Sequence, residues 1–175
     1  MQALTAGGKN YDLYWTNGLV EETGKNMETR VSGGGGANNT NVQIHSHTVI
    51  HDQIFLTDNG GKEHSFQLSG FNVACRTGND LSVLWAIKEG KKTGPYIAVY
   101  NHSTKQGFFA DGPLKRMFCR NGWLLLGAII LSLILGSKLS GFFIFIAFLL
   151  PMAWLIEGSM GAKKFKNETD FSRFK

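Results

Sequence analysis

Hydrophobic and polar positions divide the chain into two parts. From Gly122 to Ile156 nearly every residue is apolar, whereas roughly the first hundred residues mix apolar and polar positions as a soluble domain does. The full length of 175 residues leaves room for one modest domain and an appendage. Each part therefore carries its own structural prediction.

The first part has the pattern of β-strands separated by turns. Four segments are rich in the β-branched and aromatic residues that favour strands, and they lie at 41–56, 65–71, 81–88 and 95–101. Asn59-Gly60 predicts a tight hairpin between the first two, because this pair readily supplies the two positive φ angles of a type I′ turn. We therefore predict a mainly β soluble domain at 1–112, built as a small antiparallel barrel or sandwich.

Two segments of this domain need separate interpretation. The segment 11–23 is ambiguous, because Asn17-Gly18 favours a hairpin while Tyr11–Trp15 is compatible with a short helix. The glycine-rich stretch 31–41 matches neither a Walker phosphate-binding pattern nor a dinucleotide fingerprint, since a strand and not a helix is predicted to follow it. We interpret it as a loop between strands, and we predict no cofactor.

The apolar second part divides at the sequence GSKLSG into two halves. Each half is shorter than the roughly 20 residues that a helix needs to cross a bilayer, so flanking residues must extend it. We predict a two-helix transmembrane hairpin at 122–158, with helices at about 117–136 and 140–157, a basic linker at 113–121 before it and a basic C-terminal tail at 159–175. A re-entrant hairpin and the buried hairpin of a soluble protein remain as alternatives.

The distribution of charge favours a membrane over nucleic acid as the partner. The chain has a formal net charge of +5, but residues 1–113 hold nine basic residues against ten acidic ones. The basic surplus flanks the apolar part and comprises Lys115, Arg116, Arg120, Lys163, Lys164 and Lys166. Because cytoplasmic flanks carry such charges, we predict a multi-pass protein of the inner (plasma) membrane with both termini in the cytoplasm. The predicted partner is the lipid bilayer, and no nucleic acid is predicted.

Small residues recur in the first half of the apolar part. Ala128, Ser132 and Gly136 lie four residues apart and share one face of the predicted helix. Small residues at this spacing let helices approach closely, either within the hairpin or between copies of the chain. A homo-oligomer is therefore among the predicted assemblies.

Histidines form the only cluster with metal-ligand chemistry. In an extended strand His45 and His47 point to the same face, whereas His51 lies about 13 Å beyond His47. His64 across the predicted hairpin, or the acidic Asp52 or Glu63, is a candidate for a third ligand. A catalytic metal needs three well-placed ligands and the spacing guarantees only two, so we interpret these histidines as ordinary strand residues and keep a metal site as the alternative.

No serine elbow or cysteine nucleophile signature occurs, so the predicted function is not enzymatic. We predict a membrane-anchored binding, adaptor or regulatory protein whose β domain recruits an unidentified protein partner. The loops 33–40 and 89–95 are the expected contact surfaces, and Lys88, Lys91 and Lys92 are expected to approach anionic headgroups. The alternatives are an oligomeric pore-forming assembly and a metal-dependent hydrolase that uses the histidines.

Overall fold

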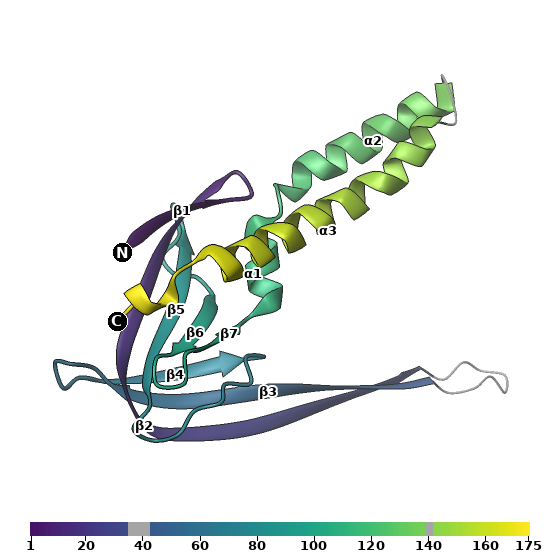
Figure 1. Ribbon diagram of the computed structural model, residues 1–175. Coiled ribbons are helices and arrows are strands. Elements are labelled where there is room, and N and C mark those ends of the chain that lie inside the picture. Colours follow the sequence, from purple (N-terminus) through teal and green to yellow (C-terminus); the bar gives the residue numbers. More distant parts are fainter. Residues whose placement is uncertain (35–42, 139–141) are drawn as a thin grey trace. The chain divides into compact units, whose positions relative to one another are not determined.

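The computed structural model describes residues 1–34, 43–138 and 142–175, with the backbone alone at 30, 33–34, 43, 45, 47, 137–138 and 142–145. The described chain forms strands first and helices last (Figure 1). The strands are β1 Gln2–Ala6, β2 Lys9–Gly34, β3 Gln43–Thr57, β4 Glu63–Ser69, β5 Asp80–Lys88, β6 Tyr96–Asn101 and β7 Gln106–Phe109. The helices are α1 Asp111–Phe118, α2 Gly122–Lys138 and α3 Phe142–Glu168, and a 3-10 turn, η1, covers Phe171–Arg173. The prediction of a mainly β domain before a helical C-terminal part is confirmed.

The strands form one sheet in the order β4-β3-β2-β5-β6-β7, and β1 pairs with the start of β2. The pairings of β1 with β2, β2 with β3, β3 with β4 and β6 with β7 are antiparallel. The path of the sheet ends at β4 and β7, and the choice between a barrel and a sandwich stays a prediction. β2 is long enough for two antiparallel partners, since its 26 residues pair with β1 near their start and with β3 further along.

The chain forms two compact units. The helical unit contains residues 1–15, 84–97 and 111–173, and the strand unit contains residues 16–83, 98–110 and 174–175. The fully buried core of the helical unit includes Leu13, Leu84, Ala86, Ile97 and Leu114. That of the strand unit includes Val20, Ile54, Leu56, Leu68, Leu81, Val83 and Phe174. The last two residues of the chain are therefore part of the strand unit.

The Asn17-Gly18 pair does not form the turn that the sequence favours. Both residues lie inside β2, which is neither a hairpin nor a helix at this point. The Asn17 side-chain amide donates a hydrogen bond of 2.6 Å to Oδ1 of Asp80. Glycine is needed at 18 because a Cβ there would lie 2.5 Å from the Thr57 carbonyl oxygen. The pair thus serves close strand packing, which overrides its turn propensity.

Two hairpins show where the left-handed backbone conformations lie. The predicted hairpin between β3 and β4 is confirmed, but its positive φ belongs to Gly61 at 76°, which indicates a three-residue loop instead of a type I′ turn. Consecutive positive φ angles occur at Gly7 (56°) and Gly8 (68°), which join β1 to β2. The sequence interpretation did not identify this first hairpin.

The helices follow the last strand directly. α1 occupies most of the segment 113–121 that the sequence presents as a linker, and α3 continues past 157 to Glu168 with Pro151 inside it. α3 packs against both α1 and α2, and Figure 1 shows α2 and α3 side by side. In the described chain no single helix is both long and apolar enough to cross a membrane. Judged by length and composition alone, α1 together with Gly122–Gly136 is long and apolar enough, and the two helices of this pair are bent by 63°.

Candidate functional site

The predicted histidine cluster lies on β3, but only part of it is described. The side chains of His45 and His47 are outside the described residues. The half-buried side chain of His51 has its Nε2 atom 3.4 Å from Oε2 of Glu28, across the β2–β3 pair. The metal hypothesis for His45 and His47 therefore stays a prediction.

His64 does not join His51. On β4, His64 pairs with Leu56 while His51 pairs with Ser69, so the two histidines stand five residues apart, about 17 Å along the strands. The Nε2 atom of His64 lies 2.9 Å from Oδ2 of Asp58, which caps the hairpin loop. Among the side chains that the structure describes, no group of three His, Cys, Asp or Glu residues is placed to hold a metal.

Asp52 belongs to the core side of β3. It is 2% exposed, and its Oδ2 atom accepts a hydrogen bond of 2.9 Å from the backbone N–H of Val73. Its other oxygen, Oδ1, lies 3.7 Å from the Lys25 ammonium. Because buried carboxylates require such partners, these contacts assign Asp52 a structural role in holding the segment after β4.

A serine–histidine pair occurs in the strand unit and has the appearance of a nucleophilic site. The Oγ atom of Ser82 lies 2.8 Å from Nε2 of His102. However, the buried Ser82 hydroxyl donates to the carbonyl oxygen of Phe174, so His102 must be the donor of the pair. The Asp80 carboxylate is held by Asn17 and the Lys175 ammonium. The pair therefore tethers the C-terminus.

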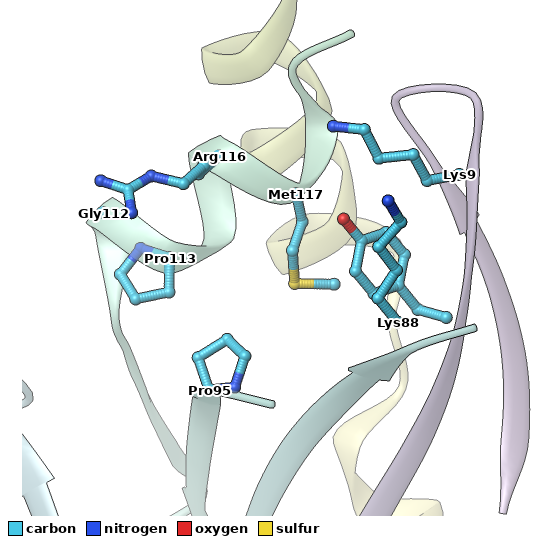
Figure 2. A pocket seen from close by; sticks show the side chains of 8 residues that line it. Lys9, Lys88, Pro95, Gly112, Pro113, Arg116 and Met117 are labelled. Carbon is cyan, nitrogen blue, oxygen red and sulfur yellow. The ribbon is translucent and has the colours of Figure 1, made fainter. Parts of the chain in front are cut away.

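A basic pocket in the helical unit is the strongest candidate for a ligand site. It has a volume of about 580 Å³, which is typical of small-molecule sites. Its lining residues come from β2, β5, the loop before β6 and α1, and they are Lys9, Tyr11, Lys88, Pro95, Gly112, Pro113, Arg116 and Met117. Figure 2 shows Met117 extending into the space bounded by Pro95, Pro113 and Lys88.

Two glycines bring the walls of the basic pocket together. A Cβ at Gly7 would lie 2.5 Å from the carbonyl oxygen of Cys119, so only glycine lets the β1–β2 turn approach the end of α1. The Lys9 ammonium donates a 3.1 Å hydrogen bond to the same oxygen. Gly94 passes too close to the Ala86 carbonyl for any side chain, and this approach places the following proline in the pocket wall.

The basic pocket has unbalanced positive charge. Lys88 and Arg116 are exposed, and neither has a carboxylate partner within the described part of the chain. The acidic residue at the start of α1, Asp111, is paired with Lys166 and does not line the pocket. Burial raises the pKa of Tyr11, so its phenol stays protonated at neutral pH and keeps a hydrogen-bond donor. The arrangement suits an anion.

The small residues predicted to mediate helix packing lie on the α2–α3 pair. Ser132 is buried, and Ala128 and Gly136 are half-buried. Ala147 on the opposing α3 is also buried. α2 packs against α3, and close approach through this small-residue face stays a prediction.

The other predicted residues occupy varied positions. Arg120 lies 3.5 Å from Glu157, Lys164 lies 3.8 Å from Glu168, and Lys115 and Lys163 are exposed. Of the two predicted contact loops, 89–95 is described and mostly exposed, whereas most of 33–40 lies outside the described residues.

The sequence interpretation named two of the three pocket cations for separate reasons. Lys88 is predicted to lie near headgroups and Arg116 beside the membrane, and both line one pocket. Lys9 and Tyr11 were missed, although the glycine pair before Lys9 is a local signal for the turn that positions them. No protein-family model, curated protein or solved structure matches this chain.

Proposed function

We propose that the protein is a membrane-anchored, non-enzymatic binding protein of the inner membrane. In this proposal the α2–α3 hairpin inserts into the bilayer, and both termini with the β-sheet lie in the cytoplasm. The observation that carries the proposal is the apolar surface of the hairpin.

Thirteen large apolar side chains of the described hairpin are between 46% and 78% exposed, and they are Trp123, Leu124, Leu126, Ile130, Leu131, Leu133, Ile134, Phe148, Leu149, Met152, Leu155, Ile156 and Met160. Complete burial of one such side chain is worth about 1.5–3 kcal/mol, so leaving this set half-exposed to water forgoes on the order of 10 kcal/mol. That amount matches the whole stability of a typical domain, about 5–15 kcal/mol. An apolar environment around the hairpin removes this cost.

The flanks of the hairpin support a bilayer as that environment. Arg120 lies just before α2 and Lys164 lies near the C-terminal end of α3, and both are exposed. The Trp154 indole N–H donates a hydrogen bond of 3.0 Å to the Arg120 carbonyl oxygen. Basic residues and tryptophan at one end of an apolar hairpin are typical of the cytoplasmic interface.

Site-directed thiol labelling tests this topology. The variant Ser137→Cys, in a background of Cys75→Ala and Cys119→Ala, is treated in intact cells with an impermeant thiol reagent. We expect labelling from outside, because a spanning hairpin brings its turn to the non-cytoplasmic face. Thr93→Cys, in the exposed loop after β5, is the matched control and should react only after permeabilisation.

The results separate the forms of the hypothesis. Labelling of Ser137→Cys only after permeabilisation would refute a spanning hairpin and favour a re-entrant one. Release of the wild-type protein from membranes by alkaline carbonate would refute the membrane anchor altogether.

A further inference from the structure

We infer that the basic pocket binds the phosphate of an anionic lipid headgroup, with the glycerol and the first acyl carbons against the apolar wall of the pocket. This inference rests on the proposed function, since it assumes that the hairpin brings the pocket to a membrane surface. It assigns a ligand class to a pocket that shares Pro95 with the predicted contact loop 89–95.

Three positively charged residues line the basic pocket. The side chains of Lys9, Lys88 and Arg116 come from β2, β5 and α1, and no acidic side chain is among the lining residues. The three like charges line one pocket of about 580 Å³, and they repel one another. A phosphate placed between them replaces this repulsion with charge-assisted hydrogen bonds.

The rest of the lining indicates an amphiphile. Pro95, Pro113 and Met117 give the pocket an apolar part of its lining, and inorganic phosphate has no group that suits it. Tyr11 also lines the pocket, and a phenol hydroxyl can donate a hydrogen bond to a phosphate oxygen. Gly112 leaves open space, since a Cβ there would meet nothing within 4 Å.

The position of the pocket in the chain indicates that the amphiphile is a lipid. Arg116 and Met117 lie on α1, and α2 begins at Gly122 only a few residues later. Both helices belong to the helical unit. A ligand in the pocket is therefore close in the chain to the segment proposed to enter the bilayer, where headgroups are concentrated. Basic residues beside a membrane helix are typical of anionic-headgroup sites.

Titration calorimetry on the full chain in a neutral detergent tests the inference. The probes are dioctanoyl phosphatidylglycerol, dioctanoyl phosphatidylcholine, glycerol phosphate and inorganic phosphate. We expect saturable, salt-sensitive binding of phosphatidylglycerol, and weaker binding of the other three. Each cation near a headgroup contributes about a fivefold gain in affinity, so Lys88→Gln with Arg116→Gln should weaken binding about 25-fold.

Matched variants control for net charge and folding. Lys62→Gln with Arg76→Gln removes the same two residue types from the exposed surface of the strand unit and should leave binding within about twofold. Arg116→Lys keeps the charge and should retain more affinity than Arg116→Gln. Because Lys88 and Arg116 are exposed, thermal unfolding of all the variants should match that of the wild type.

Three outcomes would overturn the inference. The pocket is not the site if Lys88→Gln with Arg116→Gln binds phosphatidylglycerol as the wild type does. Equal affinity for phosphatidylcholine excludes recognition of net negative charge. Glycerol phosphate that binds as tightly as phosphatidylglycerol assigns the pocket to a soluble phosphate ester instead of a lipid. These outcomes are independent of the labelling test, so a failed inference is distinguishable from a failed membrane anchor.

Discussion

Replacement of Phe174 with alanine tests whether the end of the chain is part of the core of the strand unit. The Phe174 side chain is 1% exposed, and its carbonyl oxygen accepts the Ser82 hydroxyl. Removing a buried phenyl ring costs about 3–5 kcal/mol, from lost burial plus the cavity that remains. Because residues at a chain end can move to fill part of that cavity, we expect the lower value, about 3 kcal/mol. A unit of about 80 residues loses roughly 4–8 °C per kcal/mol, so its melting midpoint should fall by more than about 10 °C.

Circular dichroism is a more suitable assay than tryptophan fluorescence, because all four tryptophans lie in the helical unit and their fluorescence reports that unit. The full chain is melted in neutral detergent as wild type, Phe174→Ala and Lys175→Ala. Lys175 is the matched control: its ammonium lies 3.3 Å from Asp80, but the side chain is 68% exposed, so its loss should cost at most about 1 kcal/mol. If Phe174→Ala and Lys175→Ala have the same melting midpoint, the C-terminus is not part of the core.

Three further predictions concern packing, pH and metal. A Cβ at Gly161 would lie 2.6 Å from a phenylalanine ring on α1, so Gly161→Ala should destabilise the chain by about 1–3 kcal/mol. Gly127→Ala is the control, because a Cβ there meets nothing within 4 Å and should leave the stability unchanged. Equal melting midpoints of the two variants would contradict the α1–α3 packing. Burial lowers the pKa of His102 in the folded protein, so at mildly acidic pH the unfolded chain binds more protons than the folded chain. The free energy of unfolding should therefore fall as the pH drops below about 6.5 and through the lowered pKa of the folded state. A His102→Gln variant with the same dependence of stability on pH would disprove this. Protein dialysed without chelator should hold clearly less than one zinc, nickel, copper or iron ion per chain, and stoichiometric metal that is lost in His45→Ala with His47→Ala would restore the enzyme hypothesis.

Local features of the fold followed from the sequence by itself. The β-branched and aromatic segments at 41–56, 65–71, 81–88 and 95–101 coincide with β3 to β6 within a few residues. The hairpin before β4 and the helices of the apolar region were also predictable. These features depend on neighbouring residues, because strand propensity, turn chemistry and apolar runs act over a few positions along the chain.

Features that depend on distant partners were decided by the tertiary structure. Asn17-Gly18 has strong turn propensity but lies in a strand, since Asp80 and the Thr57 carbonyl enclose it. Likewise, the basic pocket needs the Gly7 turn and α1 to meet, although they lie at opposite ends of the β domain in the sequence. Nothing within a few residues of Lys9 or Arg116 records that they share a cavity, because such proximity arises only when non-local strand pairing and helix packing close the chain.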